Sequence, residues 1–143
     1  LCAMVFGGIM DAIGALAKIS SYMLQLFDSI FGLFASTVFT CIGLNFTASD
    51  QYLAIVVPGK MYSKAFKEKG LAPENLSRTL EDSGTVTSVL IPWNTCGAYH
   101  SNVLGVSVAD YFVYAIFNWL SPFTTLFFAA LNIKIRQIVS NKV

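Results

Sequence analysis

The sequence is poor in charge: only 12% of its 143 residues are Asp, Glu, Lys or Arg, whereas 55% are hydrophobic. Soluble domains carry about twice that charged fraction. The few charged residues also cluster, mainly between Lys60 and Asp82 and after Ile133. The stretches between these clusters are long and nearly uncharged, which is typical of membrane-spanning helices. The net charge of +1 gives no reason to expect a nucleic-acid partner.

Several common motifs are also absent. No basic segment precedes the first apolar run, so the sequence has no signal-peptide pattern. The three cysteines, Cys2, Cys41 and Cys96, lie in apolar segments without the C-x-x-C spacing of a zinc site, and we expect free thiols. The G-x-S-G and G-x-G-D motifs of intramembrane proteases are missing. We therefore predict no enzymatic site and no cofactor.

What the sequence does contain is apolar segments, and we predict an all-α integral membrane protein. The expected spans cover roughly residues 1–17, 29–58, 85–104 and 108–133, with a polar cytoplasmic loop over 60–84. The chain begins without Met inside an apolar run. We therefore expect a piece of a longer chain that is cut within a span.

Two of these segments are expected to be broken or re-entrant. Residues 29–58 would form a helix of about 45 Å at ~1.5 Å per residue, whereas the hydrocarbon core of a bilayer is about 30 Å thick. A break near residues 43–49, or a hairpin, fits this length better. The segment 85–104 contains Pro92 and Gly97, which predict a second break between them because Pro removes an amide donor and Gly loosens the chain.

The basic residues predict how the chain is oriented in the membrane. They gather in the loop (Lys60, Lys64, Lys67, Lys69 and Arg78) and in the tail (Lys134, Arg136 and Lys142). Positive charge marks the cytoplasmic side. Two crossings separate the loop from the tail, so both should lie on that side. The turn at 105–110 and the connector at 18–28 are then external.

Counting along the helices predicts where polar side chains lie in depth. Asp50 precedes Lys60 by ten residues, or about 15 Å, and Asn94 follows Asp82 by twelve, or about 18 Å. Both should therefore meet near mid-membrane, beside the predicted breaks. An ionised group at this depth costs about 2.5–3.5 kcal/mol, so it is rarely without a function. Broken helices also free carbonyl oxygens that can coordinate a cation.

Hydroxyl, amide and carboxylate oxygens near the two breaks are candidate ligands for a cation or proton. They are Asn45, Thr47, Ser49 and Asp50 in the second segment, and Thr85, Thr87, Ser88, Asn94 and Thr95 in the third. Asp50 and Asn94 are the candidate sodium ligands among them. Asp11 follows two glycines about 10 Å below the expected outer surface, where it could line the tip of a hairpin.

Most of these candidates have a structural alternative. Asp50 could cap a helix, and Asn94 could satisfy backbone groups that Pro92 leaves unpaired. Asp82 is a candidate ion or proton ligand as well. It follows Thr79 by three residues, however, which is the spacing of a capping box at a helix start, and we expect capping or placement at an interface to be its main role.

Two long strings in the sequence, "LEDSGTVTSVLIPWNTCGAY" and "LNFTASDQYLAIVVPGKMY", closely resemble the C-terminal part of the NhaC family of sodium/proton antiporters. The strings "GLAPENLSRT" and "FGGIMDAIG" fit the same pattern, so the resemblance covers nearly the whole chain. It implies an inverted-repeat transporter with re-entrant hairpins and broken helices, a multi-pass protein of a bacterial inner or plasma membrane. Its implied partners are sodium, protons, membrane lipid and the missing N-terminal half of the same transporter, and a homodimer is left open.

The mechanism that we expect is exchange at a shared carboxylate. Sodium and a proton would compete for Asp50, with Asn94 and Thr95 adding oxygen ligands, and the site would alternate between the two faces of the membrane. The chain alone is not expected to transport, because the N-terminal half would supply the other side of the path. Two alternatives stay open: a sodium- or proton-coupled exchanger of small organic acids in the same family, and a non-transporting truncated membrane protein.

Overall fold

The computed structural model of the chain describes residues 29–48, 50–133 and 135–137, together with isolated positions before residue 29 (9, 12–14, 18 and 22). Within this described part the regular structure is helical, apart from one isolated β-bridge between Leu71 and Gln137. The all-α class predicted from the sequence is therefore confirmed for these residues. The first predicted span, residues 1–17, lies almost entirely outside them, and so does Asp11.

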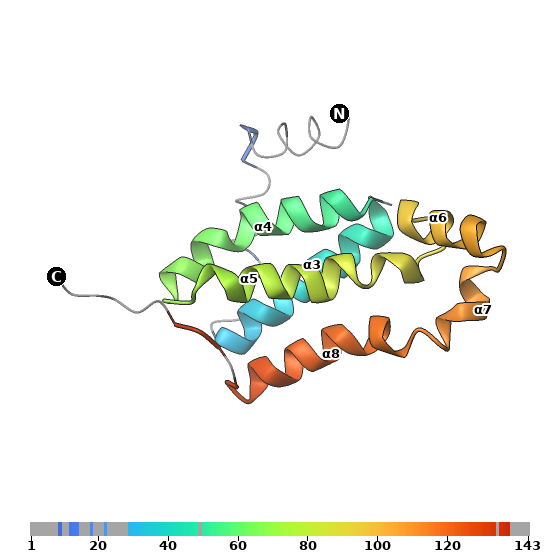
Figure 1. Ribbon diagram of the computed structural model, residues 1–143. Coiled ribbons are helices and arrows are strands. Elements are labelled where there is room, and N and C mark those ends of the chain that lie inside the picture. Colours follow the sequence, from blue (N-terminus) through green and yellow to red (C-terminus); the bar gives the residue numbers. More distant parts are fainter. Residues whose placement is uncertain are drawn as a thin grey trace.

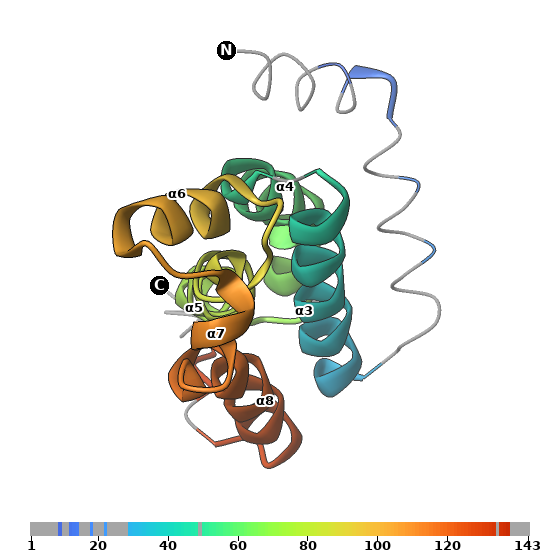
Figure 2. The same cartoon turned by 90° about the vertical axis from the view of Figure 1, so that its right-hand side faces the viewer.

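The helices pack around a central rod (Figures 1 and 2). In chain order they are α3 (Ile30–Thr47), α4 (Gln51–Glu68), α5 (Pro73–Leu80), the π-helix η1 (Glu81–Thr85), the 3-10 turn η2 (Ser88–Leu90), α6 (Thr95–Leu104), α7 (Val108–Phe112) and α8 (Ile116–Ala130). Helix α5 continues directly into η1, and this rod contacts α3, α4 and α8. The rod therefore lies at the centre of the assembly.

The second apolar segment forms two helices that pack against each other, not one long helix. Helix α3 begins after Ser29, whose hydroxyl accepts from the Gly32 amide at 3.0 Å, and ends at Thr47. Helix α4 begins after Asp50, whose carboxylate accepts from the Tyr52 amide at 2.8 Å. Each start is therefore fixed by an N-cap side chain. The break follows Thr47, at the end of the range that the sequence predicts.

Residues 60–84 do not form the expected polar loop. Helix α4 extends to Glu68, and after a short turn α5 begins at Pro73 and leads into η1. Lys64 and Glu68 lie on the exposed face of α4 with their charged atoms 3.8 Å apart, whereas Tyr62 and Phe66 are buried. The region is therefore amphipathic. The loop was predicted from the charged residues alone, whereas apolar residues recur between them at helical spacing.

The last apolar segment is also not one continuous span. Helix α7 ends at Phe112 and α8 begins at Ile116, with a turn between them. Two side chains tie this turn to the third segment: the Tyr111 hydroxyl donates to the Val89 carbonyl at 2.6 Å, and the Asn118 amide donates to the Val86 carbonyl at 2.8 Å. Within the described residues, α3 is the one helix that is long and apolar enough to cross a membrane, and α8 is apolar but shorter.

The chain after α8 returns to the turn between α4 and α5. The Ala72 amide donates to the Arg136 carbonyl at 3.0 Å. The Asn75 side chain pairs with the same residue twice, donating to its carbonyl at 2.6 Å and accepting from its amide at 3.2 Å. The basic loop region and the tail therefore lie at the same end of the helical assembly. Which side of the membrane this end faces stays a prediction.

Candidate functional site

The third apolar segment is irregular between α5 and α6. In η1 the Val86 amide donates to the Glu81 carbonyl at 3.1 Å, the wide hydrogen-bonding pattern of a π-helix. A 3-10 turn follows, and the helix stops until α6 begins after Asn94, whose side-chain oxygen accepts from the Cys96 amide at 3.1 Å. The structure thus contains the discontinuity that the sequence predicts here. Short π-helices are rare and frequently lie at functional sites.

Side chains from other elements bond the main-chain carbonyls of this irregular segment. The donor–acceptor pairs are Asn45 with Gly84 (2.7 Å), Asn118 with Val86 (2.8 Å) and Tyr111 with Val89 (2.6 Å). Irregular backbone at membrane depth is tolerated only where protein or a cavity satisfies its polar groups. These three bonds therefore explain how so polar a stretch can lie among apolar helices.

The two breaks meet at a pair of buried amides. The Asn94 side chain donates to both the carbonyl and the side-chain oxygen of Asn45, each at 3.3 Å. Asn45 in turn donates to the Thr87 hydroxyl at 3.1 Å, in addition to the Gly84 carbonyl. Both asparagines are fully buried. The pair fixes the end of α3 against the start of α6.

Gln51, the first residue of α4, extends this polar cluster. Its side-chain oxygen accepts from the Ser88 hydroxyl at 3.4 Å and from the Cys96 thiol at 2.7 Å. We call the five residues Asn45, Gln51, Thr87, Ser88 and Asn94 the break junction. Helices α4 and α6 both begin at this junction, and the N-terminus of a helix carries a partial positive charge.

The predicted meeting of Asp50 and Asn94 is not what the structure contains. Asn94 pairs with Asn45, while the half-buried Asp50 caps α4 at the edge of the junction, next to Gln51. Thr95 is exposed at the start of α6. Thr47 is also exposed, and its hydroxyl donates to the Gly43 carbonyl of its own helix at 2.8 Å. Of the predicted ligands, the structure thus brings Asn94, Ser88 and Thr87 together with Asn45.

Asp82 does not cap a helix start, which corrects the capping-box interpretation. The helix has already begun at Pro73, and Asp82 lies inside η1. Its two carboxylate oxygens accept from hydroxyls on α8, one from Ser121 at 3.2 Å and the other from Thr125. The Arg78 Nε atom lies 3.8 Å from the second oxygen. Asp82 therefore joins the central rod to α8.

Sequence reasoning missed the side chains that α8 contributes. Asn118, Ser121 and Thr125 bond Val86 or Asp82 of the irregular segment. Their spacing places them on one face of a helix, and polar residues on one face of an apolar helix are a signal for an inward-facing surface. The prediction of a span over residues 108–133 considered only how apolar this segment is, so it assigned no role to its polar face.

The oxygen atoms at the junction belong to side-chain amides, hydroxyls and main-chain carbonyls. Broken helices of transporters coordinate cations with the same groups. Among the described residues, no three His, Cys, Asp or Glu side chains form a group that could hold a metal ion. Asp50 caps α4 at the edge of the junction, and Asp82 lies in η1 with its carboxylate bonded to α8. Glu81, the first residue of η1, is exposed. The arrangement suits weak binding of a small cation better than a tight metal site.

Sequence comparison relates this chain to known antiporters. The family model described as the Na+/H+ antiporter family matches residues 1–133. The Na(+)/H(+) antiporter NhaC of Alkalihalophilus pseudofirmus is 38% identical over 99% of this chain and 31% of its own length. The arginine/ornithine antiporter ArcD of Halobacterium salinarum is 38% identical over 84% of this chain and 25% of its own length. The malate-2H(+)/Na(+)-lactate antiporter of Bacillus subtilis is 31% identical over 81% and 24%.

The chain thus spans less than a third of the length of these curated relatives. No solved structure matches it significantly.

Proposed function

Because the chain belongs to the Na+/H+ antiporter family, we propose that it is the C-terminal portion of a multi-pass membrane transporter that exchanges sodium for protons. The observation that carries this proposal is the break junction, where two discontinuous segments are held together by the buried Asn45–Asn94 pair. Discontinuous helices that meet in this way are typical of sodium-coupled transporters. Asp50 at the edge of the junction is the proposed titrating group.

The local geometry supports a cation site beside Asp50. Its carboxylate lies at the N-terminus of α4, where one of its oxygens accepts from the Tyr52 amide at 2.8 Å. Asn94 and the exposed Thr95 offer further oxygens at the neighbouring start of α6. Asp50 and Thr95 both keep exposed surface, so another part of the transporter can complete the site from that side. Sodium and a proton would then exclude each other at one carboxylate.

The test is Asp50→Asn in the full-length transporter. Asn is as good an N-cap as Asp, so the start of α4 should be preserved, but the amide cannot ionise. We expect the variant to reach the membrane in normal amount and to lose sodium-dependent dissipation of a pH gradient in everted vesicles. Asp110→Asn is the matched control, because Asp110 is an exposed acid in the capping box of α7. Normal exchange by Asp50→Asn would refute the role of Asp50.

A second candidate function is exchange of small organic ions, because two relatives are named as antiporters of arginine and ornithine and of malate and lactate. The same vesicles separate the two candidates. Sodium alone should move protons if the transporter exchanges sodium for protons. If proton movement requires an added amino acid or carboxylic acid, the organic exchanger is the better description.

A further inference from the structure

We propose that Asp82, together with the hydroxyls of Ser121 and Thr125, forms a second sodium-binding site, reached from the end of the assembly where the α4–α5 turn meets the tail. This inference rests on the proposed function, because it assumes that the transporter handles sodium. It adds a site that is separate from Asp50 and names a route to it. Three observations carry it: the oxygen ligands around Asp82, its place in the π-helix, and a cavity that shares two side chains with it.

The oxygens around Asp82 come from two elements and are well placed for a small cation. Ser121 and Thr125 lie one turn apart on α8, and each donates to a different oxygen of the carboxylate. Both are buried, whereas the Asp82 side chain keeps 24% of its surface exposed. A hydroxyl that donates to a carboxylate still has oxygen lone pairs, so a bound cation can be coordinated by the carboxylate and both hydroxyls.

The π-helix connects Asp82 to the break junction. Two residues beyond Asp82, the Gly84 carbonyl accepts from Asn45, and Thr87 accepts from the same amide. A π-helix contains one more residue per turn than the α-helix around it, and such insertions commonly mark functional positions. A shift of η1 would therefore move the carboxylate and the junction together. Asp82 is thus joined through η1 to the break junction, at whose edge Asp50 lies.

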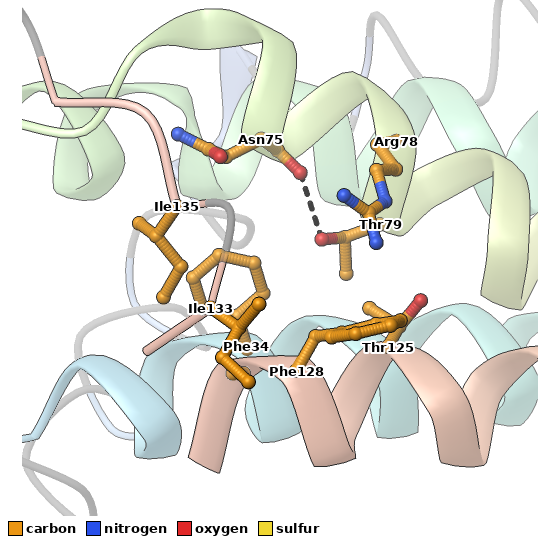
Figure 3. A pocket seen from close by; sticks show the side chains of 9 residues that line it. Phe34, Asn75, Arg78, Thr79, Thr125, Phe128, Ile133 and Ile135 are labelled. Atoms are coloured by element: carbon orange, nitrogen blue, oxygen red, sulfur yellow. Dashed lines mark hydrogen bonds between the residues drawn. The ribbon is translucent and has the colours of Figure 1, made fainter. Parts of the chain in front are cut away.

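A small cavity lies between α5 and α8 (Figure 3). Its volume is about 20 Å³, which is enough for one water molecule and therefore for a small monovalent cation. The side chains of Arg78 and Thr125, which also contact Asp82, line it together with Asn75 and Thr79. The rest of its lining is apolar: Phe34, Phe128, Ala129, Ile133 and Ile135. The cavity and the carboxylate site therefore share the side chains of Arg78 and Thr125.

The cavity opens towards the surface through shared residues. Asn75, Arg78 and Ile135 also line an open depression of about 650 Å³, to which Glu74 and Arg136 contribute charge. Asn75 and Arg78 lie on one face of α5, and Asp82 continues that face into η1. Asn75 and Arg78 therefore form a line of polar side chains along the central rod, from the open depression towards the carboxylate.

Arg78 is the residue that a cation must displace. Its guanidinium lies 3.8 Å from the Asp82 carboxylate and stacks over Phe128, with its central carbon 5.5 Å from the ring centroid. The Arg78 side chain is 46% exposed, and a pair this exposed contributes little binding energy, so the guanidinium can move away at low cost. In the absence of sodium it would balance the negative charge of Asp82.

The test measures sodium binding independently of transport, as thermal stabilisation of the purified full-length protein by sodium chloride relative to choline chloride. All variants are made in Asp50→Asn protein, which lacks the carboxylate of the first proposed site. We expect sodium-specific stabilisation to remain in this background, and the added change Thr125→Val, which keeps the shape but removes the hydroxyl, to weaken the apparent sodium affinity about tenfold or more. The added change Asp82→Asn should abolish it.

Thr124→Val is the matched control for the loss of a hydroxyl, because Thr124 is a neighbouring, exposed residue that donates to the Ser121 carbonyl at 2.7 Å. It should leave the sodium affinity unchanged. Thr125→Ser restores a hydroxyl and should restore the affinity, which would assign the effect to the hydroxyl and not to the methyl group of Thr125. The inference is overturned if no sodium-specific stabilisation remains in Asp50→Asn, or if Thr125→Val leaves it unchanged. Absence of sodium-driven proton movement in unmodified vesicles would instead refute the proposed function.

Discussion

The side chain of Asn94 donates to both the carbonyl and the side-chain oxygen of Asn45, although 49 residues separate the two asparagines in sequence. The amide group of Asn45 is used as well, because it donates to Gly84 and Thr87. One buried side chain therefore links the end of α3, the irregular third segment and the start of α6. The relative position of the two breaks depends on this link.

Asn45→Ala should destabilise the protein by roughly 1–3 kcal/mol, because it leaves the buried Gly84 carbonyl without the Asn45 amide and removes the side-chain acceptor of Asn94. The measurement is thermal unfolding of the purified full-length protein in detergent. Thr47→Ala is the control on the same helix, since that exposed hydroxyl bonds only a carbonyl one turn earlier, and it should change stability by about 0.5 kcal/mol or less. Equal stability of the two variants would show that the asparagine pair does not hold the breaks together.

Gly97→Ala should be more damaging. A β-carbon at this position would lie 2.1 Å from the carbonyl oxygen of Ile91. The main chain at Ile91 could then not lie as close to α6 as it does. We expect a loss of well over 1 kcal/mol in unfolding free energy, or failure to accumulate in the membrane. Gly43→Ala is the control, because no atom lies within 4 Å of the added carbon, and Ala in a helix interior is favoured over Gly by about 1 kcal/mol. A Gly97→Ala protein as stable as the parent would contradict the observed approach of Ile91.

The sequence was sufficient to predict the two breaks, because each has a local cause. Residues 29–58 are too long for one helix across a bilayer, and the structure contains a helix end at Thr47. Pro92 and Gly97 interrupt the next segment, and α6 begins between them. Length and backbone chemistry are local properties, so they can be assessed without knowing which helices are neighbours.

The candidate site could be predicted only in part, because its contacts depend on how the helices are rotated. Counting residues gives the depth of a side chain but not the direction in which it points. Asn45 lies little more than one helical turn before Asp50, at a similar expected depth, and it is Asn45 that faces Asn94. The capping role of Asp82 was wrong for the same reason: its partners Ser121 and Thr125 are 39 and 43 residues away.

The last prediction concerns the end of the assembly where the α4–α5 turn and the tail are in contact. The loop region carries five of the nine basic residues, so this end is predicted to be cytoplasmic. Because the Ala72 amide and the Asn75 side chain both bond Arg136, the tail must share that side. We would replace the exposed Ser63 and Gln137 singly by Cys in a background without native cysteines, and label them with an impermeant thiol reagent.

Both positions should be protected in intact cells and labelled in everted vesicles. Val106→Cys, in the exposed turn predicted to be external, should behave in the opposite way and controls for the integrity of the vesicles. The two possible failures have different meanings. If both Ser63→Cys and Gln137→Cys are labelled from outside, the orientation is inverted but the contact between loop and tail is retained. If only one of them is labelled from outside, the two segments lie on opposite sides, and the observed pairing of Asn75 with Arg136 cannot exist in the membrane.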